Sequence, residues 1–218
     1  RSNIAQLIYS GSPSGGNTVF VDNVYFYDEN SGGGNPTEPV SAAPAPGQNQ
    51  SDVISMFSDS YADVAIDTWR TDWSSATLED VTIDGSAMKK YSELSFVGVE
   101  AVSSPIDASG MTHFSTDVWS ADFEEFKVIL VDFGADGMFG GGEDFVDEFV
   151  VSSPAQGQWV SLDIPLSEFT GLTTRSNIAQ LIYSGSPSGG NTVFIDNVYF
   201  YDENSGGGNP TEPVSAAP

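Results

Sequence analysis

Residues Asn191–Asp202, NTVFIDNVYFYD, are rich in β-branched and aromatic side chains and occur twice in the chain. Residues 1–44 and 175–218 have the same sequence at an offset of 174 positions, apart from Val21 in the first copy and Ile195 in the second. A repeat of this period predicts tandem copies of one module. We therefore expect that the chain holds one complete copy and that further copies are covalently linked to it.

The same stretch predicts a strand with an irregularity in its middle. Val193 and Ile195 lie on one face of an extended chain. After Asp196–Asn197, however, Val198 and Phe200 take the same face, although Val198 is three positions after Ile195 and regular alternation would place it on the opposite face. A β-bulge across Asp196–Asn197 would restore the phase and re-aim a side chain.

Composition divides the chain into four segments. We interpret residues 1–29 as the C-terminal tail of a preceding copy and residues 30–50 as a linker rich in Gly, Pro, Ser and Ala. Residues 51–202 are then the complete module, and residues 203–218 are the linker to the next copy. Because the tail has only two strand-like runs, we expect it to pack on the module, to pack on another chain, or to be disordered.

The module itself consists of short apolar runs separated by Gly, Asp, Asn and Ser, and helix signals are almost missing. The expected strands are Ser95–Ala101, Thr112–Trp119, Phe126–Phe133, Val146–Val151, Trp159–Pro165, Ile178–Ser184 and Val193–Tyr201. Many short strands at this spacing predict an all-β fold, an antiparallel β-sandwich of the jelly-roll kind.

The chain is strongly acidic, with 31 acidic and 6 basic residues and a formal net charge of −25. Nucleic acid is not an expected partner, because phosphate binding needs clustered cations, and the same holds for an anionic membrane surface. Such acidity indicates either solubility in a saline exterior or divalent-cation sites. Cysteine is absent, which excludes disulfides and thiolate metal sites, and no run is long and apolar enough for membrane insertion.

Catalysis has little support in the sequence. His113 is the single histidine, and the absence of cysteine excludes a cysteine nucleophile and most zinc sites. A glycosidase needs only two carboxylates. In a chain with 31 acidic residues, however, neighbours such as Glu124 and Glu125 arise by chance. We therefore predict that the module is not an enzyme.

Several segments carry a resemblance to a known family. The segments VISMFSDSYADV, GQWVSLDIPLSEF and TVFIDNVYFYD resemble landmarks of galactose-binding-like jelly-roll carbohydrate-binding modules. DTWRTDW, KKYSELSFVGVE and LVDFGADG are similar to modules repeated in secreted or surface-anchored proteins of marine polysaccharide-degrading bacteria. The resemblance covers residues 51–202.

The resemblance implies a non-catalytic module that binds a polysaccharide outside the cell or at its surface, with β-1,3-glucan (laminarin) as the first choice. It also implies a structural calcium between the first strand and the terminal strand, held here by Asp196 and the region Phe57–Asp59, including Asp59. The alternative for Asp196 is a bulge aspartate that accepts hydrogen bonds from local backbone N–H groups. Related modules bind sugar either on a sheet face or at the loop end, and no motif decides between these places.

Two groups of residues are candidate sugar contacts, because flat aromatic rings stack on pyranose rings and polar groups bind their hydroxyls. The first group is Trp69, Arg70, Asp72 and Trp73. Its alternative is structural, with Arg70 in an internal salt bridge and one tryptophan closing the end of the sandwich.

The second group is Trp119 with Asp117 and His113 on the same strand face, and with Phe96 and Gly98 beside them. A glycine there would leave room for a ring. The alternative is that a loop such as Ala121–Glu125 covers this face. We assign Trp159 to the hydrophobic interior rather than to the ligand.

Residues Asp132–Glu143, DFGADGMFGGGE, partly match a twelve-position calcium loop, with Asp132 at position 1 and Asp136 at position 5. The flanking segments are expected strands rather than helices, so an exposed acidic hairpin without metal is the alternative. A different function also stays open: a calcium-rigidified structural or adhesive spacer that presents nothing to sugar.

Overall fold

The computed structural model describes residues 7, 36–140 and 142–204, so most of the predicted tail and of the second linker lies outside the described residues. One short 3-10 helix, η1 (Gln50–Asp52), precedes the strands of this part of the chain. The strands are β1 (Val53–Phe57), β2 (Ser75–Ile83), β3 (Ser86–Glu100), β4 (His113–Ser120), β5 (Glu125–Asp132), β6 (Phe145–Ser152), β7 (Trp159–Pro165), β8 (Ile178–Ser186) and β9 (Asn191–Tyr201). All their pairings are antiparallel, which confirms the predicted all-β sandwich.

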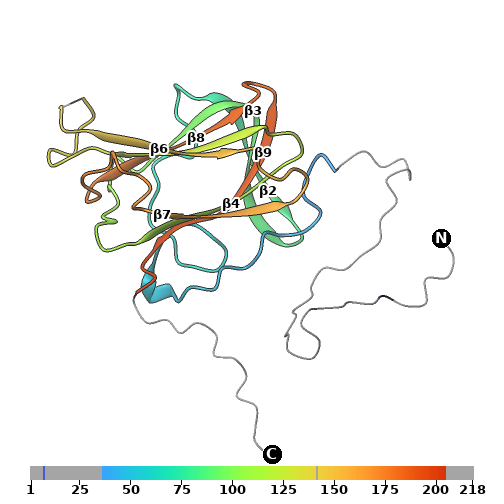
Figure 1. Cartoon of the computed structure of the whole chain (residues 1–218), viewed down its shortest axis with the longest axis horizontal. Helices are drawn as coiled ribbons and strands as arrows, with labels where there is room; N and C mark the ends of the chain where they lie inside the picture. The colour runs from blue at the N-terminus through green and yellow to red at the C-terminus, as the bar shows by residue number, and fades with distance from the viewer. Residues whose placement is uncertain (1–6, 8–35, 141, 205–218) are drawn as a thin grey trace, which may run out of the picture. The chain divides into compact units, whose positions relative to one another are not determined.

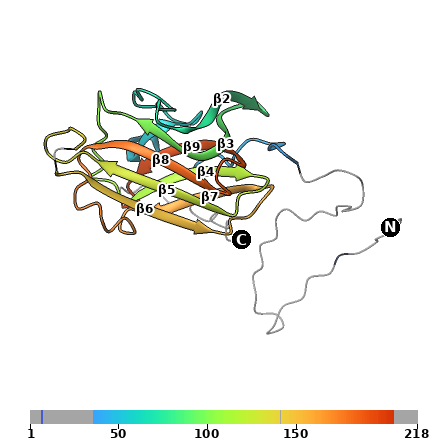
Figure 2. The same cartoon turned by 90° about the horizontal axis from the view of Figure 1, so that it is seen from above.

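The strands form two layers (Figure 1). The upper layer contains β6, β5, β8 and the C-terminal part of β3, in that order, and Figure 2 looks onto it. The lower layer contains the N-terminal part of β3 followed by β9, β4 and β7, with β2 beside β3 and β1 beside β9.

Strand β3 belongs to both layers. Its residues 89–94 pair with β9, whereas its residues 96–100 pair with β8. Near the end of the first stretch, between Tyr91 and Leu94, the register shifts, and Glu93 has a φ of 55°. A residue in this left-handed region marks a bulge, and bulges bend the strand that contains them. The bulge at Glu93 therefore turns β3 from the lower layer into the upper one.

The core lies between the layers and follows the alternation predicted from the sequence. Inward positions come from β3 (Val97, Val99), β4 (Phe114, Thr116, Val118), β5 (Val128, Leu130), β7 (Leu162, Ile164) and β8 (Leu181, Tyr183), and all of them are buried. The part of the chain that the structure describes contains no helix that is long and apolar enough to cross a membrane.

The predicted bulge in β9 is confirmed. Asn197 has a φ of 50°, and the register of β9 against β4 shifts between Ser115 and Asp117. Val193 and Ile195 before the bulge and Val198 and Phe200 after it all belong to the same core cluster. The two bulge residues, Asp196 and Asn197, are thereby turned out of this core while they stay buried, with exposed fractions of 2% and 5%.

Candidate functional site

The outer face of the upper layer displays three rows of cross-strand neighbours. Residues directly opposite each other in antiparallel strands point to the same face of a sheet. Because Val97 and Val99 point into the core, their neighbours on β3 point outward. The rows are Phe96–Ser184–Lys127–Val150, Gly98–Ile182–Ile129–Glu148 and Glu100–Gln180–Val131–Val146.

A groove of about 760 Å³ lies over the third row. Its floor is formed by the strand residues Glu100, Gln180, Val131, Val146 and Ile182. Its walls come from three connections. Trp73 from the β1–β2 connection and Val102 from the β3–β4 connection lie on the β3 side, and the segment between β5 and β6 contributes Phe133, Gly137, Met138 and Phe139. The groove thus combines aromatic rings with a few polar groups, as ligand-binding clefts commonly do.

Trp73 forms the aromatic wall on the β3 side. Its side chain is 45% exposed, and its ring lies nearly parallel to that of Phe96, with centroids 6.1 Å apart and planes at 20°. The loop that carries Trp73 is fixed to β3, because Thr71 N–H donates to Gly98 O at 3.1 Å and Gly98 N–H donates to Ser74 Oγ at 3.0 Å. These hydrogen bonds therefore hold the Trp73 ring in a fixed position beside β3.

Arg70 shapes the same loop from within. Its Nε donates to Ala76 O at 2.7 Å, and its two terminal nitrogens donate to Thr71 O and Ser74 O at 3.4 Å each. The guanidinium thus spans three carbonyls of the segment that surrounds Trp73. It binds carbonyls rather than a carboxylate, which differs from the predicted internal salt bridge but serves the same structural purpose.

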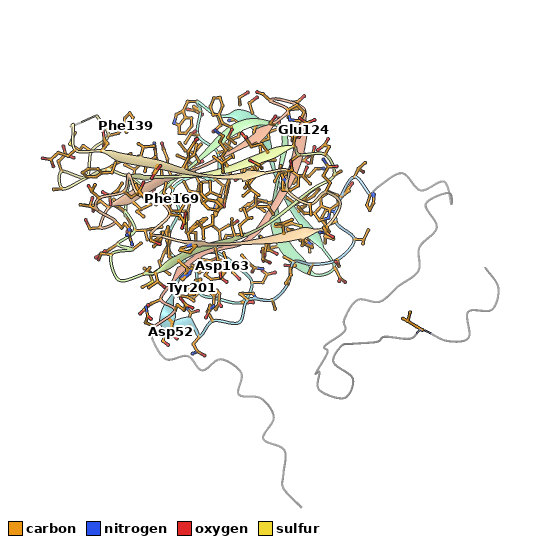
Figure 3. The ribbon with its side chains drawn as sticks, in the orientation of Figure 1. Asp52, Glu124, Phe139, Asp163, Phe169 and Tyr201 are labelled. Carbon is orange, nitrogen blue, oxygen red and sulfur yellow. The ribbon has the colours of Figure 1, made fainter. Side chains whose placement is uncertain are left out.

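The opposite wall is built on the β5–β6 loop, whose tip carries Phe139 (Figure 3). Met138 and Phe139 are 67% and 68% exposed, and the Phe139 ring lies 5.6 Å from that of Phe133. Asp136 and Asp144 accept backbone hydrogen bonds within this loop, from Met138 N–H at 3.0 Å and from Gly140 N–H at 2.7 Å. This wall was not predicted from the sequence, although two large apolar residues among glycines, Met138 and Phe139, are its signal there.

The polar groups of the floor are paired with each other. Gln180 Nε2 donates to Glu100 Oε1 at 2.9 Å. In the neighbouring rows, Lys127 forms an ion pair with Glu148 at 3.0 Å and a longer one with Glu125 at 3.9 Å. The floor therefore offers one carboxylate, Glu100, and one amide, Gln180, beside the apolar surface, which is the chemistry that sugar hydroxyls require.

Of the first predicted group, Trp73 alone reaches the groove. Trp69 packs against the core, with its ring 5.5 Å from that of Phe57 in an edge-on arrangement. Arg70 is bound to carbonyls as described above, and Asp72 is exposed beside the groove-lining tryptophan. The predicted cluster thus divides into one groove residue, one core residue, one loop brace and one exposed carboxylate.

The second predicted group lies on the outer face of the lower layer and does not form an open surface. Trp119 is 2% exposed and packs edge-on against Phe194, with ring centroids 5.6 Å apart. Met88, Val81, Ile83 and Trp159 pack in the same cluster, together with Ala121 from the loop that we expected to cover this face. Trp159 thus belongs to this outer cluster rather than to the core between the layers.

The polar members of that group are also covered. Asp117 is 6% exposed and accepts a hydrogen bond from Asn197 Nδ2 at 2.7 Å. His113 stacks on Tyr201, with ring centroids 4.9 Å apart, and its Nδ1 lies 2.9 Å from Thr112 Oγ1. Phe96 and Gly98, which we expected beside Trp119, lie under Trp73 on the other layer.

The two carboxylates of the first predicted calcium site do come together. The Ser86 hydroxyl lies 3.1 Å from Asp59 Oδ2 and 3.0 Å from Asp196 Oδ2. Backbone N–H groups also reach them: Ala87 donates to Asp59 at 2.9 Å, and Asn197 donates to Asp196 at 2.7 Å. Burial raises the pKa of Asp196 to about 6, against hydrogen bonds from Asn197 and Ser86 that lower it, and the charges of Asp117 and Asp59 raise it further.

These contacts bear on the metal in two ways. Two carboxylates and a hydroxyl are oxygen ligands of the kind that calcium takes. The backbone N–H bond of Asn197, however, is the hydrogen bond expected for a bulge aspartate without metal. Within residues 36–140 and 142–204, no group of three or more histidine or acidic side chains is arranged to hold a metal ion.

In the second predicted calcium site, the carboxylates accept hydrogen bonds from backbone N–H groups. Asp132 is fully buried, and its two oxygens accept hydrogen bonds from Gly134 N–H at 2.7 Å and Asn177 N–H at 3.0 Å. Asp136 accepts from Met138 N–H at 3.0 Å. Asp136 therefore supports a turn of the loop, whereas Asp132 joins the start of the loop to Asn177 and is buried rather than exposed.

Comparison with known proteins places this fold. No protein-family model matches the chain, and no curated protein matches it. Among solved structures, the family 30 carbohydrate-binding module of a cellulosomal cellulase of Clostridium thermocellum has a TM-score of 0.53 at 14% identity, over 70% of this chain and 98% of that chain. A second structure of a family 30 carbohydrate-binding module also scores 0.53 at 14% identity, over 75% and 94% of the two chains.

A further similar structure is the family 11 carbohydrate-binding module of another cellulosomal cellulase of Clostridium thermocellum, with a TM-score of 0.50 at 12% identity, over 69% of this chain and 94% of that chain. The chain has the jelly-roll fold of these modules. At this level of identity the likeness concerns the fold, so the function has to be argued from the groove.

Proposed function

We propose that residues 51–202 are a non-catalytic polysaccharide-binding module and that the groove over the third row holds a glycan chain. The observation that carries this proposal is the exposed ring of Trp73, fixed at the edge of a groove with Glu100 and Gln180 in its floor. An aromatic face stacks on the apolar face of a pyranose, and the carboxylate and amide bind its hydroxyls. The similar fold of the carbohydrate-binding modules named above supports the proposal.

The preferred ligand is a neutral β-glucan, with β-1,3-glucan (laminarin) first. A net charge of −25 and the carboxylates Glu100 and Glu148 on the groove face disfavour polysaccharides that carry uronate or sulfate groups. Laminarin is favoured over other neutral glucans by the sequence resemblance described above. The repeat supports an extracellular array in which neighbouring copies bind one polymer and so gain avidity.

Calorimetry of the full chain against laminarin, mixed-linkage glucan, xylan, agarose and alginate tests this proposal. We expect binding to a neutral glucan, weaker binding in Trp73→Ala, and unchanged binding in Trp159→Ala. Trp159 is the matched control, because it is a half-buried tryptophan on the outer face of the other layer. The proposal fails if no glycan in the panel binds, and the site assignment fails if Trp73→Ala binds as well as the original chain.

We further propose a structural calcium held by Asp59 and Asp196, with the Ser86 hydroxyl beside them. Asp59 lies in the β1–β2 connection, Ser86 is the first residue of β3, and Asp196 lies in β9, so a bound cation would tie three segments together. The same group favours the second candidate function, a calcium-rigidified spacer. A spacer would show calcium-dependent stability while no glycan in the panel binds, and so the two functions separate in one set of measurements.

A further inference from the structure

Residues 36–50, which composition assigns to a linker, are bound to the module. Trp159 Nε1–H donates to Ser41 O at 3.0 Å, and Asn197 Nδ2 donates to Pro44 O at 3.0 Å. Pro39 is buried. The compact unit that contains the module accordingly begins at Gly34 rather than at Ser51. We call residues 36–50 the strap.

The C-terminal half of the strap is bound as well. Tyr61 Oη donates to Gln48 O at 2.9 Å, and Ala62 N–H donates to Gln50 Oε1 at 2.6 Å. Most of these contacts use the backbone carbonyls of the strap, which suits a segment rich in proline that has few N–H groups to satisfy. The strap therefore has partners in the β1–β2 connection, in β7 and in β9.

Asn197 makes the strap part of a buried polar network. Its side chain donates to Asp117 Oδ2 at 2.7 Å and accepts from Ser58 Oγ at 2.8 Å, in addition to its bond to Pro44 O. A buried amide that loses a partner bears a desolvation cost. Removal of the strap would leave one Asn197 proton without its present acceptor, so the strap and the β9 bulge stabilise each other.

The sequence of the strap recurs at the other end of the chain. Residues 36–44, PTEPVSAAP, are identical to residues 210–218, and the preceding ENSGGGN recurs at residues 203–209. We propose that residues 210–218 bind to the outer face of the lower layer of a following copy of the module, as residues 36–44 bind to this one. The inference rests on the proposed tandem arrangement and is independent of glycan binding.

This assignment shortens the connection between copies. The connection between copies is then at most ENSGGGN, residues 203–209, and it begins at the module itself, because Glu203 N–H donates to Thr112 Oγ1 at 2.8 Å. A chain of this length spans at most about 25 Å when fully extended. Neighbouring modules would lie close together, and the short tether would raise the effective concentration of each groove for one polymer chain.

Two matched replacements in the full chain test the role of the strap. In one variant residues 36–44 are replaced by a Gly/Ser sequence of equal length, and in the other residues 210–218 receive the same replacement. We expect the first variant to have a lower melting temperature and the second to melt like the original chain. Equal melting temperatures in all three chains would overturn the proposal.

Trp159→Phe provides a second test, because it removes the indole N–H while it keeps an aromatic ring. We expect this substitution to lower the melting temperature of the original chain and to have no further effect once residues 36–44 are replaced. Additive effects would show that Trp159 does not bind the strap and would contradict the proposal.

A synthetic peptide tests whether the sequence alone directs the docking. We expect the peptide PTEPVSAAPAPGQNQ, at millimolar concentration, to restore part of the melting temperature lost in the chain with replaced residues 36–44. A scrambled peptide of the same composition should have no effect. If neither peptide restores stability, the repeated sequence does not specify docking, and the assignment of residues 210–218 to a following copy is wrong.

Discussion

The six-membered ring of Trp73 occupies the space in which a Cβ at position 98 would stand, so the tryptophan depends on Gly98 for its place. Gly98 lies in the middle row of the upper layer, and hydrogen bonds in both directions connect its backbone to the loop that carries Trp73. The exposed indole of Trp73 thus takes its position in the groove because residue 98 on β3 is a glycine and has no side chain.

Gly98→Ala should therefore weaken glycan binding, although the substitution itself alters no residue that lines the groove. The added methyl group would displace the Trp73 ring, and loss of one aromatic contact reduces affinity by roughly tenfold or less. Calorimetry with the preferred glucan measures the effect. Gly110→Ala is the matched control, because nothing lies within 4 Å of its Cβ position. Equal affinities of the two variants would show that Trp73 does not contact the glycan.

Arg70→Met should lower both stability and affinity. The substitution keeps the length of the side chain but removes donors to the carbonyls of Ala76, Thr71 and Ser74. Loss of hydrogen bonds from a charged group costs about 1.5–3 kcal/mol in unfolding free energy. Because these carbonyls surround Trp73, the loop should also lose its fixed position.

Denaturant unfolding and calorimetry measure the two effects of Arg70→Met. Arg175→Met is the control, since the Arg175 side chain makes no hydrogen bond or ion pair within the part of the chain that the structure describes, and its backbone carbonyl, which accepts from Ala108 N–H, is kept in the variant. A stable Arg70→Met variant with unchanged glycan affinity would contradict the bracing role of the guanidinium.

The core could be predicted from the sequence because alternation alone determines it. Inward residues such as Val97 and Val99 follow the period-two spacing of a strand. The change of phase across Asp196–Asn197 can also be recognised from the sequence. Strand β2 was missed for the converse reason. Its sequence SATLEDVTI has few large apolar residues, and it is held at the edge by its pairing with β3 rather than by burial.

The groove could not be predicted in the same way, because it joins residues that are far apart in the sequence. Trp73, Phe139 and Gln180 become neighbours through strand order. The sequence also does not distinguish Trp73 from Trp119, since both precede or end apolar runs. Packing from β2, β3 and Trp159 buries Trp119, and that packing depends on the register of distant strands.

Asp196 should make stability depend on pH in chelator-treated protein. Burial raises its pKa from 3.8 to about 6, so between these values the folded chain keeps a proton that the unfolded chain has lost. The folded state then binds more protons, and its stability from this group decreases as pH rises through this window. Burial also raises the pKa of Asp117, which faces the same site and adds to the trend.

The comparison of the original chain with Asp196→Asn isolates this group from the general acidity of the chain. Relative to the original, the variant should gain stability as pH rises from about 4 to above 6, because asparagine never acquires the buried charge. Urea unfolding at the two pH values measures the difference. A difference that stays constant with pH would show that Asp196 titrates with an ordinary pKa.

If Asp59 and Asp196 bind calcium, the cation should offset the loss of stability that the buried charge of Asp196 causes at higher pH. Above pH 6 the Asp196 carboxylate is ionised and can bind a cation, so millimolar calcium should raise the melting temperature of the original chain relative to chelator. A ligand at 100 times its dissociation constant stabilises the folded state by about 2.7 kcal/mol. The gain should disappear in Asp59→Asn and in Asp196→Asn, and also in the original chain at pH 4, where Asp196 is protonated.

Asp136→Asn separates the two predicted calcium sites, because Asp136 lies in the β5–β6 loop and caps Met138 N–H there. If the bulge site binds calcium, this variant should keep the full gain in melting temperature. If Asp136→Asn abolishes the gain while Asp196→Asn keeps it, the cation binds in the loop that forms the groove wall. In that case calcium would fix the loop that carries Phe139, and removal of calcium would weaken glycan binding as well as stability.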